Sequence, residues 1–313
     1  MPFLSGDRRF KTMTEAHFII DTTVIRPKDL GTLDQLHGGL VAANSVASFQ
    51  KATKLHTIER IAAKLAKTGQ VGELVPIVVI GHAGSVNACL AGLFSINPDL
   101  RWPILLIDCP AKGIKVNQMV SGILASLATK NIHQVRLGKI SGFVPKQGNQ
   151  YFLDTFQIGP DFSAILPKFD QKFALKNAFH QAINFWGFSS RNQNNVTFAW
   201  TLRFGSTYQS HSKTLGFQII LGQGDQPNEV HIVNQVSWPQ ILRTYRQGKK
   251  GTVNPSRKGF TSFAISEPAD FHIRDIQTAV ADSQALNTGA YAFRLTTAGT
   301  YPVVIPADPQ QEN

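Results

Sequence analysis

The sequence predicts an N-terminal doubly wound parallel α/β domain followed by an antiparallel, β-sandwich-like domain. Two observations indicate this order. Up to about residue 130, buried strand segments alternate with helical segments, as in parallel sheets that carry helices on both faces. From about residue 140, apolar residues recur at every second position, which is typical of strands that bury one face.

The first domain begins with a short apolar strand at residues 17–20, which runs into Asp21. A clear amphipathic helix is predicted over residues 56–67, because its apolar residues recur at three- and four-residue steps. A buried strand at residues 103–107 follows later. It precedes a helix whose apolar stripe lies within residues 116–127.

The stretch from residue 75 to residue 94 organises this domain. An apolar run over residues 76–80 stops at Gly81, and a helical pattern follows the turn Gly-His-Ala-Gly-Ser. Ser85, the last residue of this turn, is interpreted as the N-cap of the helix. Glycines let backbone N–H groups approach a ligand, and a helix N-terminus favours anions. The stretch therefore predicts an anion site; a tight turn without a ligand is the alternative.

The second domain is predicted from alternating apolar residues. Its strands are expected at residues 196–204, 215–221, 230–236 and 271–280. Clusters of Gly, Ser, Asn and other polar residues at 204–213 and 222–229 are interpreted as the segments that separate these strands. Ser237 is expected to cap a short helix with Pro239 in its first turn.

Charge indicates which partners to expect. The 313-residue chain holds 31 Lys and Arg residues against 20 Asp and Glu, a net charge of +11. No acidic residue lies between Asp108 and Asp154, or between Glu229 and Glu267. Such a surface favours nucleotides, phospholipid headgroups or an anionic membrane, although a generally basic, solvated surface is the alternative. No nucleic-acid partner is expected, since no nucleic-acid-binding motif accompanies these intervals.

The remaining composition indicates a cytoplasmic protein. The two cysteines, Cys89 and Cys109, suit a reducing compartment without disulfides. The N-terminal residues lack a signal-peptide pattern, and no apolar run approaches the roughly 20 residues of a membrane helix. Any membrane contact is therefore expected to be peripheral, at the inner membrane face. The oligomeric state stays open, with a homodimer as one option.

The glycine stretch resembles the nucleotide signature of the diacylglycerol kinase-like lipid kinases, relatives of the sphingosine kinases. That signature is a strand, then Gly-Gly-Asp-Gly-Thr, then a helix beginning with Asn. The matching positions in this chain are Gly81, Gly84, Ser85 in place of Thr, and Asn87. His82 and Ala83 depart from the signature, and Ala83 stands where the family has its acid. After the first strand, Asp21 replaces the Asn of the family's phosphate-binding turn.

The resemblance continues in register from about residue 17 to residue 306. It places further family positions at Thr53, at Gly113 in a second nucleotide loop, at Gly159 and Asp161, and at Asp282 followed by Gln284 in place of Glu. Residues 301–306 resemble the closing strand, which in the family returns to the first domain. The implied domains are residues 1–140 with 288–313, which bind nucleotide, and residues 141–287, which receive the lipid.

This resemblance implies ATP-dependent phosphorylation of a lipid alcohol such as diacylglycerol, with Mg²⁺. The implied nucleotide-binding residues are Gly81, Ala83, Gly84, Ser85, Asn87, Thr53 and Gly113. Asp282 and His82 are the candidate general bases, and Asp161 is the candidate metal ligand. The alternative is an impaired relative, because Ala83 and Gln284 replace acids. It would bind nucleotide, phospholipid or a protein partner without turnover.

Overall fold

A computed structural model of the chain describes residues 15–25, 27–70, 72, 75–108, 115–129, 131–142, 149–158, 198–235, 237, 239, 260–274, 279–281, 284–286 and 292–307. The chain divides into two compact units. Unit 1 contains the residues up to Val135 together with those from Tyr301 onward, and unit 2 spans Arg136–Thr300.

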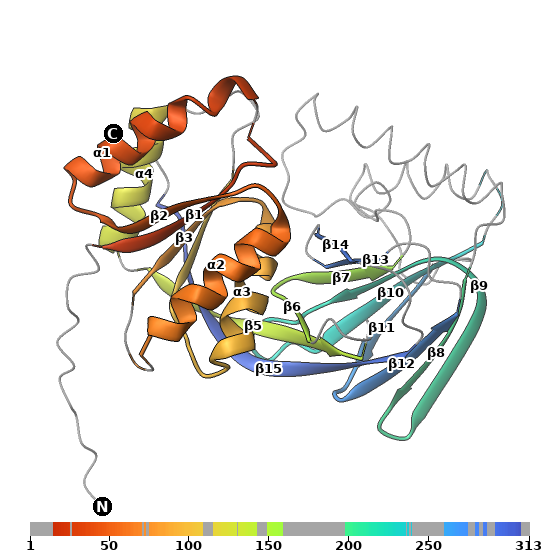
Figure 1. Cartoon of the computed structure of the whole chain (residues 1–313). Helices are drawn as coiled ribbons and strands as arrows, with labels where there is room; N and C mark the ends of the chain where they lie inside the picture. The colour runs from red at the N-terminus through yellow and green to blue at the C-terminus, as the bar shows by residue number, and fades with distance from the viewer. Residues whose placement is uncertain are drawn as a thin grey trace, which may run out of the picture. The chain divides into compact units, whose positions relative to one another are not determined.

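Unit 1 is built on a parallel sheet. Its strands lie in the order β15-β4-β3-β1-β2, with β1 (Ala16–Asp21), β2 (Val46–Ala52), β3 (Ile77–Gly81), β4 (Ile104–Asp108) and the end of β15 (Ala292–Val304) (Figure 1). The pairs β1–β2, β1–β3, β3–β4 and β4–β15 are all parallel. The central strand β3 is buried along its whole length, as expected for a strand with helices on both faces.

Four α-helices cover this sheet: α1 (Thr32–Ala42), α2 (Leu55–Thr68), α3 (Ala83–Ile96) and α4 (Val116–Thr129), with a short 3-10 turn, η1, at Pro27–Asp29. Helices α1 and α4 pack together on one face of the sheet, and α2 and α3 pack together on the other (Figure 1). Gly92 allows the close approach of α2 and α3, because a Cβ at this position would lie 2.1 Å from the Glu59 carbonyl oxygen.

Unit 2 is antiparallel. Its described strands are β5 (Ile132–Ser141), β6 (Gln150–Phe152), β7 (Thr155–Ile158), β8 (Phe198–Phe204), β9 (Thr207–Ile220), β10 (Asn228–Asn234), β11 (Phe260–Ile265), β12 (Ala269–Arg274), β13 (Ala279–Ala281), β14 (Gln284–Leu286) and most of β15. The main path runs β14-β13-β7-β9-β8-β12-β15. In addition, β10 pairs with β9 and β11, and β5 pairs with β15 and β6.

The core of unit 2 is rich in aromatic side chains that point to one face of these strands. Phe271 stacks on Phe293 with a ring-centroid distance of 4.8 Å, and it meets Phe217 edge to face at 5.3 Å. Trp200 is buried in the same cluster, and its indole N–H donates to Thr214 Oγ1 at 2.9 Å. The alternate residues of β8, β12 and β15 point away from this core and include several charged side chains.

The predicted fold class is confirmed: a parallel α/β region, then an antiparallel region, then a final strand that pairs within unit 1. One prediction is wrong in detail. The polar segment 204–213 was expected to separate strands, but β9 already begins at Thr207. Its polar side chains are mostly exposed, and pairing with β8 satisfies the backbone, so the segment needs no apolar face. No helix in the described part of the chain is long and apolar enough to cross a bilayer.

Candidate functional site

The glycine stretch forms the junction between β3 and α3, at the carboxyl edge of the unit 1 sheet. Strands β1 and β3 are parallel neighbours with Ile20 opposite Ile80, so Asp21 and Gly81 end the two strands at the same level. Helix α3 begins at Ala83, which leaves only His82 between strand and helix. The sequence placed an anion site here, and the carboxyl ends of parallel strands are where ligands of such sheets bind.

His82, and not Ser85, is the N-cap of α3. Its backbone is extended, with φ −132° and ψ 177°, and its Nδ1 accepts a hydrogen bond from the Ser85 N–H at 3.0 Å. Ser85 is the third helical residue, and its Oγ accepts from the His82 N–H at 3.2 Å. The two residues thus form a reciprocal capping box. The interpretation of Ser85 as the N-cap is therefore wrong, because Ser85 is the N3 residue of this capping box.

Asp21 is bound to the same junction. The Ser85 hydroxyl donates to Asp21 Oδ2 at 2.6 Å, and Asp21 Oδ1 accepts from the Thr23 backbone N–H at 3.0 Å and from its hydroxyl at 2.6 Å. The Asp21 side chain is completely buried. Three donors make this burial tolerable, because a buried carboxylate without hydrogen bonds would be strongly unfavourable. The end of β1 is thereby joined to the start of α3.

Gly81 is required by this arrangement. A Cβ at this position would lie 2.6 Å from Ser85 Oγ and 3.1 Å from the Asp21 Cβ. The sequence pattern predicts that Gly81 lets a ligand approach the backbone. In the structure, the space beside Gly81 is occupied by the Ser85 and Asp21 side chains of the chain itself.

His82 presents one polar atom beyond the junction. Its Nδ1 lies 3.0 Å from the Ser85 backbone N and 2.7 Å from the Ser85 Oγ. With the ring proton on Nε2, Nδ1 accepts from the N–H; with the proton on Nδ1, it donates to Oγ. The Nε2 atom of the half-buried His82 is therefore a donor or an acceptor at the start of α3, according to the tautomer. The first N–H groups of the helix, at Ala83 and Gly84, also have no partner within the helix itself. A general-base role for His82 would use the tautomer in which Nδ1–H donates to Ser85 Oγ and the Ser85 N–H no longer donates to the ring.

The other predicted site residues lie in three settings. Asn87 is buried in the first turns of α3. Thr53 is exposed and directly follows β2, at the same edge of the sheet as Asp21, since Asp21 pairs with Ala52. Gly113, Asp161 and Asp282 lie outside the described residues. Asp21 was not among the candidate site residues, although its place after an apolar strand and in the family's phosphate turn indicated the position.

The described residues hold no cluster of metal-ligating side chains. Among them, no group of three or more His, Cys, Asp and Glu side chains could hold a metal ion. Two carboxylates end strands at this edge: Asp21, whose oxygens both already accept hydrogen bonds from Ser85 and Thr23, and Asp108, which is exposed at the end of β4 and lies opposite Gly81. Mg²⁺ binding normally uses one or two accessible carboxylates together with water and substrate phosphates. Asp108 is such an accessible carboxylate, whereas Asp21 is not.

Comparison with solved structures identifies the fold. No family model and no curated protein matches the sequence. A structure of a putative diacylglycerol kinase from Bacillus anthracis strain Sterne aligns with a TM-score of 0.60 at 15% identity, covering 96% of this chain and 99% of that chain. A structure of a diacylglycerol kinase from the same organism aligns with a TM-score of 0.56 at 15% identity over the same shares. The chain has the diacylglycerol kinase fold.

This kinase fold includes both units, since the alignments cover nearly the whole chain. A second structure of the putative kinase, at 14% identity, aligns over 94% of this chain with a TM-score of 0.60. At these identities the similarity establishes the fold, and the activity has to be argued from the β3–α3 junction and its neighbours. The stretch with the kinase-like signature is the same stretch that forms this junction.

Proposed function

We propose that the chain is a lipid kinase that binds the phosphates of ATP at the β3–α3 junction and phosphorylates a lipid alcohol such as diacylglycerol. One observation carries the proposal: a signature-like glycine stretch forms the N-terminus of a 14-residue helix at the carboxyl end of a buried central strand, within a kinase fold. Strand ends of this kind, followed by a helix N-terminus, are general sites for phosphate.

The junction would contribute hydrogen-bond donors. With its proton on Nε2, His82 could contact phosphate oxygens, as could the first N–H groups of the helix, at Ala83 and Gly84. Phosphoryl transfer depends mainly on positioning and on neutralising charge, so donors held by a rigid capping box suit it. In the family, Mg²⁺ neutralises the phosphates. Among the described residues, the exposed Asp108 beside Gly81 is the carboxylate that could hold it.

The proton of the lipid hydroxyl needs a general base. Asp282 is the proposed base, on the strength of the sequence resemblance. Removing a general base typically lowers the rate by about 10²–10⁴-fold. His82 is the weaker candidate, because it presents a lone pair at Nε2 only in the tautomer in which the Ser85 N–H loses its bond to the ring.

A second candidate function is binding without turnover. It is favoured by the chemistry of the junction, where Ala83 has no acid and Asp21 is buried with its oxygens bound to Ser85 and Thr23. Such a protein would bind a nucleotide or a phospholipid and would not transfer phosphate.

One experiment separates the two functions. The full chain would be incubated with labelled ATP and a panel of diacylglycerol, sphingoid and other long-chain alcohols, and its thermal unfolding would be measured with ATP, ADP and lysophospholipid. Labelled lipid that falls about 10²-fold or more in Asp282→Asn, but not in the exposed control Asp99→Asn, supports the kinase. Stabilisation by a ligand without transfer supports the second candidate. An absence of both would contradict both.

Asp21 allows a sharper test of where the phosphates bind. Asp21→Asn keeps the shape of the side chain and an acceptor for Thr23, but it removes a negative charge at the start of α3. If phosphates bind there, we expect ATP to bind roughly tenfold more tightly, because like charges less than 10 Å apart repel strongly in a partly buried site. The measurement is calorimetric titration, with Asp99→Asn as control. An unchanged affinity would place the phosphates elsewhere.

A further inference from the structure

A second polar site lies in unit 2, on the sheet face opposite the aromatic core. An open cavity of about 780 Å³ lies over strands β8, β12 and β15, and its polar lining includes Thr201, Arg203, Tyr208, Asp270, His272 and Arg294. We refer to it as the sheet-face pocket. It belongs entirely to unit 2 and shares no residue with the β3–α3 junction.

Strand register brings the charged side chains together. Asp270 on β12 is directly opposite Arg203 on β8 and Arg294 on β15, so these three residues form one row across three strands. His272, two residues along β12, points to the same face and is opposite Thr201. The alternate residues Phe271 and Ile273 are buried in the core, which fixes the orientation of the row.

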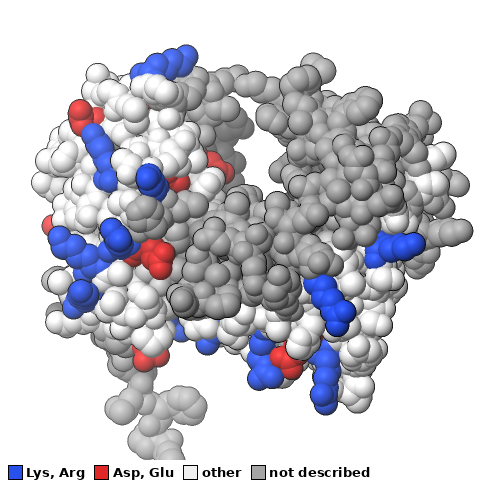
Figure 2. Space-filling model, turned by 45° about the vertical axis from the view of Figure 1, so that its right-hand side comes forward, with Lys and Arg blue, Asp and Glu red and all other residues white. Residues whose placement is uncertain are grey.

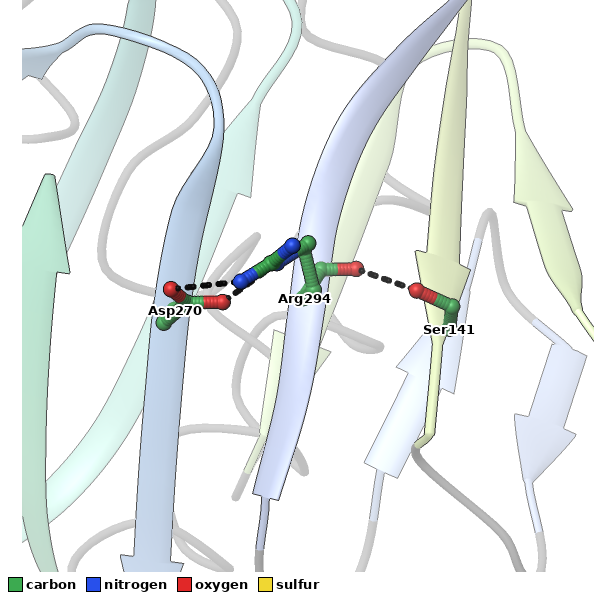
Figure 3. A network of polar contacts seen from close by, with 3 residues as sticks. All are labelled: Ser141, Asp270 and Arg294. Atoms are coloured by element: carbon green, nitrogen blue, oxygen red, sulfur yellow. Dashed lines mark hydrogen bonds and ion pairs between the residues drawn. The ribbon is translucent and has the colours of Figure 1, made fainter.

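The middle of the row is held in place by an ion pair. Arg294 donates from Nε to Asp270 Oδ1 at 2.6 Å and from Nη2 to Oδ2 at 3.1 Å, and the Ser141 hydroxyl lies 3.5 Å from the Arg294 carbonyl oxygen (Figure 3). This pairing lowers the pKa of Asp270, so the carboxylate is ionised at neutral pH. Arg294 Nη1 remains without a hydrogen bond to any described residue.

Arg203 is not paired in this way. It is exposed, and it forms no hydrogen bond or ion pair with the described residues, although its charge also lowers the pKa of Asp270. The row therefore has two guanidinium groups and one carboxylate, with His272 as a further potential cation. Basic side chains also predominate over acidic ones on the face of the molecule in Figure 2. The pocket as a whole favours an anion.

The surroundings favour an anion that carries an organic part. A second cavity of about 710 Å³ shares Thr201, Tyr208 and His272 with the sheet-face pocket and extends to Arg274. The two therefore form one elongated depression. Tyr208 lies at its side, 66% exposed, where its ring could cover an apolar group of a ligand.

We propose that the sheet-face pocket binds a phosphate group, with Arg203 and Nη1 of Arg294 as the charged donors and the hydroxyl groups of Thr201 and Tyr208 beside them. The ligand class is inorganic phosphate or a phosphate ester, either free in solution or carried by an anionic phospholipid headgroup. Guanidinium groups suit this chemistry because their planar array of donors matches phosphate oxygens. The proposal does not depend on the proposed kinase activity, because it uses other residues in the other unit.

The test compares Arg203→Gln with Arg60→Gln in the full chain. Both remove one exposed arginine charge, but Arg60 lies on α2 in unit 1. In one arm, inorganic phosphate and glycerol 3-phosphate are titrated by calorimetry and thermal unfolding, against chloride at matched ionic strength. In the other arm, co-sedimentation is measured with phosphatidylglycerol vesicles and with phosphatidylcholine vesicles. Arg203→Lys, which keeps the charge but not the planar fork, is included in both arms.

We expect Arg203→Gln to weaken binding at least tenfold, Arg203→Lys to weaken it less, and Arg60→Gln to bind like the unmodified chain. Loss in the first arm identifies a free phosphate compound as the ligand, and loss restricted to phosphatidylglycerol vesicles identifies a headgroup. Equal binding by Arg203→Gln and the unmodified chain, equal weakening in Arg60→Gln, or no binding of any probe would each overturn the proposal. ATP affinity in Arg203→Gln should stay unchanged, which separates this result from a failure of the kinase proposal.

Discussion

The two units place their polar side chains in different parts of a sheet. In unit 1, Asp21 and Ser85 are buried at the edge where parallel strands end. In unit 2, Arg203, Asp270 and Arg294 lie across the exposed face of antiparallel strands. The difference follows from what covers each sheet. Helices cover both faces in unit 1, so only the strand ends are left for polar chemistry, whereas the outer face of the antiparallel strands in unit 2 remains open.

The hydrophobic cores of the two units also differ, in the side chains that fill them. The central strands β3 and β4 of unit 1 are almost uninterrupted Ile, Val and Leu, and β3 is buried throughout. The strands of unit 2 alternate, and their buried positions carry large aromatic side chains. A sheet with one buried face has fewer positions with which to fill its core, and large rings compensate for this. The stability of unit 2 should therefore depend on single side chains more strongly than that of unit 1.

The largest expected effect tests this dependence. Phe271→Ala removes a fully buried ring that packs against Phe293 and Phe217, and we expect it to lower the free energy of unfolding by about 3–5 kcal/mol. Urea unfolding followed by tryptophan fluorescence would measure it, because three of the four tryptophans, Trp200 among them, belong to unit 2 and Trp102 belongs to unit 1. Phe271→Leu is the control and should cost less. A loss below about 1 kcal/mol for Phe271→Ala would contradict the expectation that the stability of unit 2 depends strongly on single core side chains.

A smaller effect is expected at the junction in unit 1. Ser85→Ala removes the hydroxyl that donates to Asp21 Oδ2 and leaves that buried oxygen without this partner. We expect a loss of about 1–3 kcal/mol in the free energy of unfolding. Ser95→Ala on the same helix is the matched control, because the exposed Ser95 only donates to the Gly92 carbonyl oxygen. Similar losses in both variants would show that the junction is no more stabilising than a helix surface.

Alkaline pH should reveal a further difference between the two units, in how their stability depends on pH. Burial raises the pKa of the Cys89 thiol to about 12 from its usual 9.0, and burial also raises the pKa of Tyr301 well above its usual 10.0. Both residues belong to unit 1. Above pH 9 the unfolded chain releases the Cys89 proton while the folded chain keeps it, so stability falls as pH rises. Each group can contribute up to about 1.4 kcal/mol per pH unit.

This loss is expected from pH 9 upward for Cys89, with Tyr301 adding to it above pH 10. The measurement is the free energy of unfolding at closely spaced pH values from 8 upward. Cys89→Ala is less stable at pH 8 because it leaves a small cavity, but its stability should decline less steeply between pH 9 and 10. An identical slope in both proteins would contradict the role of the thiol.

The sequence allowed the fold class and the place of the junction to be predicted, because both depend on local patterns. The period of apolar residues distinguishes the two units, and a strand followed by glycines and a helical pattern locates β3 and α3. The cap was assigned to the wrong member of a pair, since His82 and Ser85 each bond to the other and three-residue spacing does not say which is the N-cap.

Contacts between distant residues could not be predicted in this way. Ser85 and Asp21 are 64 residues apart and meet only because β1 and β3 are neighbours in the sheet. The row in the sheet-face pocket depends on the register of three strands, and a shift of one residue would turn Arg203 or Arg294 into the core. Register of this kind is set by the whole sheet and leaves no local signal.

Strand β15 has a consequence for how the chain folds during its synthesis. Its pairing with β4, and the hydrogen bond from the Tyr301 hydroxyl to the Trp102 carbonyl oxygen, join residues 199 positions apart. At ribosomal speeds of about 5–20 residues per second, that interval takes roughly 10–40 s to translate. During this time β4 has an open edge, which a chaperone or a neighbouring nascent chain can reach. Unit 1 therefore becomes complete only after unit 2 has left the ribosome.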